Sequence, residues 1–248
     1  MDIQSYLDHT DQLFEVYKKL KLVSIDDYYE ETSSRWNDKN FISYFTDVTR
    51  SKNTLNSFDT SDFKMYDDFV MLSGDIKFCA GMLHYLFPYT TKEPKDFTSS
   101  IIDRRYIMHV SFGYQSIYQF WDRIGDFLWI YFFTGIEAKK VYTGGVLKNL
   151  PEIYKNCEPY LQLKKSYESF NYTFRMRHDI VHNCSMGTEL FWERNKYYTN
   201  EKKLNKLLSK VQGYRDKITK SLPQCIEALF CALELIQQLP NKTIEINT

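Results

Sequence analysis

The feature that most constrains this chain is the length of its segments with apolar residues at every third or fourth position. The 248 residues include only nine Gly and six Pro, and these cluster between the long segments, which favours helices over a sheet protein with many turns. Apolar side chains at this spacing form one stripe along an α-helix. We therefore expect an all-α protein.

The stripes also give approximate positions for the elements. They predict helices over 3–20, 61–86, 97–133, 160–182 and 201–239. Shorter or less regular helical segments are expected over 24–35, 40–50 and 146–154. Pro223 should kink or split the last helix, because proline lacks an N–H and clashes with the preceding turn.

These segments suggest one bundle with additions at both ends. We expect an antiparallel helical bundle over residues 96–240. An N-terminal helical segment over 1–95 precedes it, and a tail over 241–248 follows.

Charge and cysteine content limit the classes of function. The 32 basic and 32 acidic residues give a formal net charge of zero, whereas a protein that coats nucleic acid is usually basic. Any contact with nucleic acid must therefore rest on a local patch or pocket. The five cysteines form no CxxC pair, so neither a disulfide framework nor a zinc knuckle is expected.

The cysteines and the hydropathy of the chain also predict its cellular compartment. Free thiols suit a reducing cytoplasm, and the N-terminal sequence MDIQSYLDHTDQ has no apolar core of a secretory signal. The most apolar stretch, FLWIYFF over residues 127–133, is far too short to cross a bilayer. A cytoplasmic protein without membrane contact is expected.

One short motif carries potential chemistry. Residues 175–183 read RMRHDIVHN. They contain the pattern R-x4-H from Arg177 to His182, with His178 directly after the arginine and Asp179 next. The motif lies at the end of a predicted helix, where Asn183 is a plausible stop.

These residues resemble the signature of the HEPN superfamily (higher eukaryote and prokaryote nucleotide-binding domains). That family is a helical bundle with an R-x4-6-H motif on a late helix, usually with a polar residue after the arginine, as His178 is here. The resemblance covers roughly residues 97–240. It implies an endoribonuclease that needs no metal or other cofactor and works as a homodimer, in which two motifs face one cleft.

The resemblance also implies a role for each motif residue. His182 would be the general base on a ribose 2′-OH or the general acid on the leaving oxygen, because imidazole gains and loses a proton near neutral pH. Arg177 would hold the scissile phosphate by bidentate hydrogen bonds. His178 would orient the substrate or share proton transfer, with Asp179 and Asn183 in support.

Two acids upstream are candidates to position the arginine. Asp122 and Asp126 stand four apart in WDRIGD, so one of them could face the motif and pair with Arg177. The alternative is that both lie on a solvated helix face, and an exposed pair would contribute only about 0–1 kcal/mol.

Other interpretations of the motif remain open. His182 on its own could simply end a helix. His178 and His182 form HxxxH, a spacing that can bind metal, but no third ligand is visible nearby, and we expect no metal. Arg104 and His109 in RRYIMH match the same bare pattern. We prefer the later copy, which has the polar residue after the arginine, aliphatics before the histidine and a helix end.

A second segment, ELFWERNKYY, is predicted as a polar, aromatic loop. Within it, Trp192, Arg194 and Lys196 are candidates for contact with RNA or a partner, because rings stack on bases and cations bind phosphate. Lys202 and Lys203 are interpreted as a solvated helix face.

Three functions follow, in order of preference. The first is a metal-independent endoribonuclease of the HEPN type, in the toxin, phage-defence or stress-response setting that the resemblance implies, with a cognate antitoxin as a candidate partner. The second is a non-catalytic HEPN protein that binds RNA, a nucleotide or a protein. The third is a structural helical protein whose motif is accidental. Whether the chain is an enzyme is not decided by the sequence.

Overall fold

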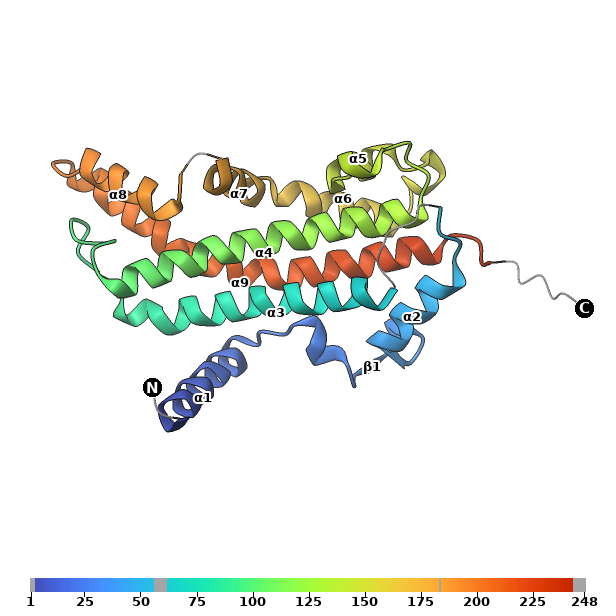
Figure 1. Cartoon of the computed structure of the whole chain (residues 1–248), viewed down its shortest axis with the longest axis horizontal. Helices are drawn as coiled ribbons and strands as arrows, with labels where there is room; N and C mark the ends of the chain where they lie inside the picture. Colours follow the sequence, from blue (N-terminus) through green and yellow to red (C-terminus); the bar gives the residue numbers. More distant parts are fainter. Residues whose placement is uncertain (1–2, 56–61, 183, 243–248) are drawn as a thin grey trace, which may run out of the picture. The chain divides into compact units, whose positions relative to one another are not determined.

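The computed structural model describes residues 3–55, 62–182 and 184–242. Almost all of its regular structure is helical, so the all-α prediction is confirmed (Figure 1). The α-helices are α1 (Ile3–Leu20), α2 (Phe41–Ser51), α3 (Asp62–Leu86), α4 (Ile101–Tyr131), α5 (Thr143–Asn149), α6 (Glu158–Ser169), α7 (Asn171–His182), α8 (Met186–Lys196) and α9 (Glu201–Gln237). Within the described residues, β1 (Thr32–Ser33) and β2 (Lys39–Asn40) form the one sheet, an antiparallel pair of strands.

The chain forms two compact units that interleave along the sequence. Unit 1 contains the residues up to Val23 together with Gly74–Tyr118 and Tyr172–Leu222. Unit 2 contains Ser24–Ser73, Gln119–Asn171 and the residues from Pro223 onward. Helices α3, α4 and α9 each run from one unit into the other. The expected boundary near residue 95 falls between α3 and α4 and stays a prediction.

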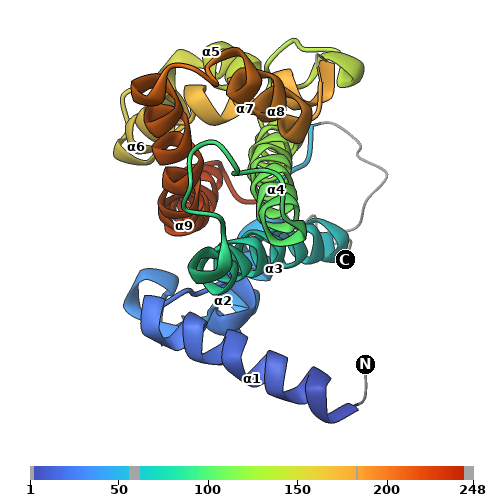
Figure 2. The same ribbon diagram turned by 90° about the vertical axis from the view of Figure 1, so that its left-hand side faces the viewer.

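The core of unit 1 is built where three long helices meet. Figure 2 looks along α3, α4 and α9 from the end that belongs to unit 1. Tyr106 of α4 donates its hydroxyl toward the carbonyls of Val211 (3.4 Å) and Gln212 (3.3 Å) of α9. Seven residues, or about two turns, further along each helix, Ile218 of α9 packs against Gly113 of α4. The equal offsets show that α4 and α9 run parallel to each other.

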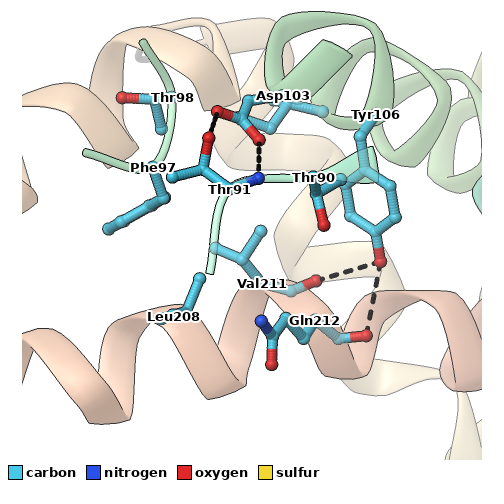
Figure 3. Close-up of a pocket in the computed structure, with 10 residues that line it drawn as sticks. Thr90, Thr91, Phe97, Thr98, Asp103, Tyr106, Leu208, Val211 and Gln212 are labelled. Atoms are coloured by element: carbon cyan, nitrogen blue, oxygen red, sulfur yellow. Dashed lines mark hydrogen bonds between the residues drawn. The ribbon is translucent and has the colours of Figure 1, made fainter. Parts of the chain in front are cut away.

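A buried carboxylate ties the loop before α4 to this core. Asp103 accepts hydrogen bonds from the Thr91 backbone N–H (2.8 Å) and the Thr91 hydroxyl (2.7 Å). Figure 3 shows both bonds beside a pocket of about 20 Å³ that is lined by α4, α9 and this loop. A space of that size holds about one water molecule, so it is a packing defect and not a substrate pocket.

Unit 2 has a separate aromatic core. Phe69 of α3 lies 5.2 Å from Phe120 and 5.9 Å from Phe127 of α4, measured between ring centroids. Trp121 of α4 lies 5.2 Å from Phe170, which follows α6. Such ring pairs contribute about 0.5–1.5 kcal/mol each beyond the area they bury.

Most of the long helices occur where the stripes predicted them, and two details differ. The expected helix over 160–182 is two helices, because Phe170 turns its side chain into the core of unit 2 and its N–H bonds to the Tyr167 carbonyl (3.1 Å) in a tightened last turn. Of the kink or split expected at Pro223, the split does not occur, since α9 continues through this residue as one helix.

Two glycines on helices of unit 1 give a paired test of this packing. A Cβ at Gly213 would meet no atom within 4 Å, so Gly213→Ala should raise the free energy of unfolding by about 0.5–1 kcal/mol. A Cβ at Gly113 would lie 2.8 Å from Ile218 Cδ1, so Gly113→Ala should lower it by about 1–3 kcal/mol. Urea unfolding followed by circular dichroism measures both. Equal effects of the two substitutions would contradict the contact between α4 and α9.

Candidate functional site

The arginine of the motif is held against an aromatic ring. Arg177 lies in the second half of α7 and is half-buried. Its guanidinium carbon stands 4.2 Å from the ring centroid of Tyr118 on α4. Phe174, one turn earlier on α7, packs edge-on against the same ring at 5.9 Å. A cation this close to the face of a ring is attracted to it by about 0.5–1 kcal/mol at such a site, which restricts where the guanidinium lies.

The two histidines of the motif lie on one exposed face of α7. The ring centroids of His178 and His182 are 4.6 Å apart with 46° between the planes, as their four-residue spacing predicts. Both side chains are exposed. Two groups that can give or take a proton are thus presented to solvent, side by side, at the end of the helix that carries Arg177.

The residues expected to support the motif lie in different parts of the structure. Asp179 is half-buried on α7, and Asn183 lies outside the described residues. Asp122 and Asp126 belong to unit 2, whereas the motif belongs to unit 1. The Asp126 carboxylate accepts a bond from Arg123 one turn earlier (2.5 Å). Burial raises the pKa of Asp126, and Arg123 partly offsets that rise.

The earlier copy of the pattern is placed differently. Arg104 is exposed, but His109 is buried on α4 with its ring 5.6 Å from that of Phe78. Burial, together with the nearby Arg105, lowers the pKa of His109. A polymeric substrate cannot reach an imidazole in that position, so the accessible copy of the motif is the one on α7.

A comparison with protein families gives the relationship of the chain. The family model described as Cthe2314-like HEPN matches residues 79–243, well over half of the chain. The chain belongs to this HEPN family. The matched region begins within α3 and contains α4 to α9, including the motif on α7. No curated protein and no solved structure matches the chain.

The predicted loop after the motif is a helix in this HEPN protein. Ser185 caps α8 by accepting a hydrogen bond from the Thr188 N–H (3.2 Å), so the loop prediction is wrong. The sequence signal was present in Ser185, a preferred N-cap residue. The run of aromatic residues and Gly187 favoured the interpretation as a loop.

The three candidates for ligand contact on α8 differ in their exposure to solvent. Trp192 is 65% exposed and Lys196 is exposed. Arg194 instead points inward and donates to the Phe97 carbonyl (2.8 Å) and the Thr98 hydroxyl (3.3 Å). Thr98 has a φ of 77°, which strains a β-branched residue. Arg194 therefore holds a strained turn, which leaves Trp192 and Lys196 as the candidates for contact with a ligand.

Tyr118 is a residue of the site that the sequence did not reveal. Its ring orients Arg177, yet in the sequence it is one more aromatic on a helix full of them. Only the three-dimensional structure shows which of these rings meets α7.

Neither a cluster of metal-ligating side chains nor a membrane-spanning helix occurs among the described residues. Within residues 3–55, 62–182 and 184–242, no three His, Cys, Asp or Glu side chains gather as they would to hold a metal ion. None of the helices in that part of the chain is both long and apolar enough to pass through a lipid bilayer.

The inward position of Arg194 can be tested by stability. Arg194→Ala removes the donor to a strained, buried turn, and an unsatisfied buried carbonyl costs about 1–3 kcal/mol. Lys196→Ala, at the exposed last residue of the same helix, is the control and should change stability by less than about 0.5 kcal/mol. Thermal unfolding of both variants measures the difference. An Arg194→Ala protein as stable as the control would show that the bond to Phe97 is not formed in solution.

Proposed function

We propose that this HEPN protein is a metal-independent endoribonuclease that works as a homodimer. The observation that supports the proposal best is the arrangement on α7, where a ring-stacked Arg177 and two exposed histidines 4.6 Å apart occupy one helix end. This set contains the two kinds of group that phosphodiester cleavage by acid–base catalysis needs: a cation for the phosphate and imidazoles for the protons.

The proposed reaction is attack by the ribose 2′-OH on the adjacent phosphorus. One histidine, His182, removes the proton from the 2′-OH as the 2′ oxygen forms its bond to phosphorus. The bond from phosphorus to the 5′ oxygen then breaks, and a second protonated imidazole, from His178 or from the motif of a second copy, gives a proton to that oxygen. The products are a 2′,3′-cyclic phosphate and a free 5′-hydroxyl. No oxidant, reductant or water is consumed.

Arg177 would stabilise the charge that builds on the phosphate oxygens. Its planar fork can donate two parallel hydrogen bonds, which lysine cannot reproduce. The guanidinium carbon lies over the Tyr118 ring, 4.2 Å from its centroid, so the cation is held near that ring before substrate arrives. Less ordering is then needed when the phosphate binds.

Substitution of the motif tests catalysis. In the presence of EDTA, the wild-type protein should cleave single-stranded RNA, and His182→Ala should reduce the rate by about 10²–10⁴-fold. Arg177→Lys should lose about 10²–10³-fold, because it keeps the charge but loses the fork. Gel analysis of labelled RNA, with a check for the cyclic phosphate end, measures each rate.

The control is His9→Ala, a histidine on α1 that is half-buried against Tyr85. It should keep the wild-type rate. Cleavage that EDTA abolishes, or that His182→Ala leaves intact, would contradict the proposal. Binding of RNA without cleavage would favour the second function, a HEPN protein that binds RNA and does not cut it.

The proposed dimer has a candidate surface on α4. One stripe of this helix presents three large apolar side chains to solvent: Ile101 (64% exposed), Met108 (42%) and Phe112 (49%). They lie within 40° of one another around the helix at 100° per residue, and all belong to unit 1, like the motif. Three large exposed apolar side chains along one helix face make this stripe a candidate interaction surface. A second copy of the chain is the proposed partner, because it would supply a second motif and with it a further imidazole for proton transfer.

Charge on this stripe should dissociate the dimer. The double variant Met108→Glu/Phe112→Glu places carboxylates where apolar contact is proposed, so the protein should elute as a monomer and lose RNA cleavage. Met71→Glu, an exposed methionine of α3 in unit 2, is the matched control and should leave both unchanged. Size-exclusion chromatography with light scattering measures the mass. A monomeric wild-type protein that cleaves RNA would exclude the dimer but not the motif.

A further inference from the structure

The N-terminal half of α9 carries four lysines on one face. Lys203, Lys206, Lys210 and Lys217 fall within about 60° around the axis at 100° per residue, and they span about 21 Å along it at 1.5 Å per residue. All four are exposed, whereas the opposite face of α9 is buried in the core. We call these four residues the lysine stripe.

One end of the stripe borders a groove with an aromatic side chain. The groove has a volume of about 350 Å³ and is lined by Lys203, Lys206 and Lys210, with Tyr197, Glu193 and Leu207. The Lys203 ammonium lies 5.1 Å from the Tyr197 ring centroid. A half-exposed ring among lysines offers the two things that single-stranded nucleic acid binds, a stacking surface for a base and cations for the phosphates.

The other end of the stripe reaches the helix that carries the motif. The Lys217 ammonium stands 3.9 Å from the ring centroid of Tyr172. Tyr172 lies in the first turn of α7, five residues before Arg177. The groove, the stripe and the motif helix all belong to unit 1. A polyanion that follows the stripe from the groove would therefore arrive at α7.

The acidic residues near the lysine stripe do not neutralise its positive charge. Glu193 stands 4.0 Å from Lys210, a long contact for an ion pair. Asp216 is bound by its neighbour Arg215 (3.0 Å). The four lysines thus face one acid in the groove, and the stripe keeps a positive excess although the whole chain has a net charge of zero.

In the middle of the lysine stripe, Gly213 leaves one position of the helix surface without a side chain. It lies between Lys210 and Lys217, and a Cβ there would meet nothing within 4 Å. Packing inside the protein therefore gives no reason for a glycine, which costs helix stability. Its place on the stripe leaves the helix backbone open to close approach by a ligand.

We propose that the lysine stripe and Tyr197 bind the backbone of single-stranded RNA and lead it to α7. This inference rests on the proposed function for its ligand, and it adds a binding surface outside the motif. The stripe supplies phosphate contacts without base recognition, so binding is independent of sequence and weakens as salt rises.

The test measures binding apart from cleavage. The probe is a short, unstructured, fluorescent 2′-O-methyl oligoribonucleotide, which lacks the attacking 2′-OH and cannot be cut. Fluorescence anisotropy over a range of salt gives the slope of log affinity against log salt. Each lost phosphate contact lowers that slope by about 0.7 for a single strand. Lys203→Gln/Lys206→Gln/Lys210→Gln should therefore reduce it by about 2.

A matched triple variant controls for net charge. Lys139→Gln/Lys140→Gln/Lys165→Gln removes three exposed lysines of unit 2 and should leave the slope unchanged. Tyr197→Leu should weaken affinity with little change in slope, because stacking is not electrostatic. Circular dichroism confirms that each variant is folded.

The outcomes separate this inference from the proposed function. An unchanged slope in the stripe variant, an equal fall in both triple variants, or no binding by the wild-type protein overturns the stripe. Displacement of the probe by an acidic peptide but not by unlabelled RNA also overturns it, in favour of a protein partner. If the stripe binds RNA but His182→Ala changes no cleavage rate, the stripe stands and the catalytic proposal fails.

Discussion

Helix α4 is the element on which the positions of the other parts of unit 1 depend. Its buried face gives Tyr106 to the carbonyls of α9 and Gly113 to the side chain of Ile218. The half-exposed Tyr118 further along receives Arg177 and Phe174 of α7. Because one rigid helix makes these contacts, the motif helix and α9 are both positioned relative to α4. A substitution that disturbs the packing of α4 would therefore displace both the motif and the lysine stripe.

The motif combines an ordered arginine with accessible histidines, and this difference follows from the helical period. The five-residue offset between Arg177 and His182 places them about 140° apart around α7. When Arg177 lies against Tyr118, His182 must therefore point away from α4. His178, four residues before His182, follows it to the exposed face. A guanidinium held by the protein and imidazoles that face solvent are thus the result of spacing, not of a special loop.

The long helices could be predicted from the sequence because their signal is repeated many times. The predicted limits of 3–20 and 61–86 match α1 and α3 within a residue, and α4 and α9 differ only at their ends. Burial of one face over several turns outweighs local preferences. The break at Phe170 could not be predicted in this way, since one buried ring decides it and its partner Trp121 lies far away in the sequence.

The individual site residues were harder to predict, because similar side chains have different partners. Arg194 and Lys196 stand two positions apart in one predicted segment, yet one supports the strained Thr98 and the other is exposed. Arg104–His109 and Arg177–His182 share a pattern, yet His109 is buried and His182 is not. Burial is a property of the packed chain, and a short motif does not contain it. The sequence features around the motif favoured the later copy, and the structure adds that the histidine of the earlier copy is buried.

The net charge of zero is compatible with binding a polyanion because electrostatic attraction acts over a short range. At physiological salt the Debye length is about 8 Å, so a phosphate on the lysine stripe interacts with charges within a few residues and not with the acids elsewhere on the chain. The relevant quantity is then the local count, which along about 21 Å of α9 is four lysines and Arg215 against Glu193 and Asp216. Such a surface gives little long-range steering. It favours a strand that is already close. This suits the proposed role, in which the protein places one phosphate at the end of α7 and does not coat a long polymer.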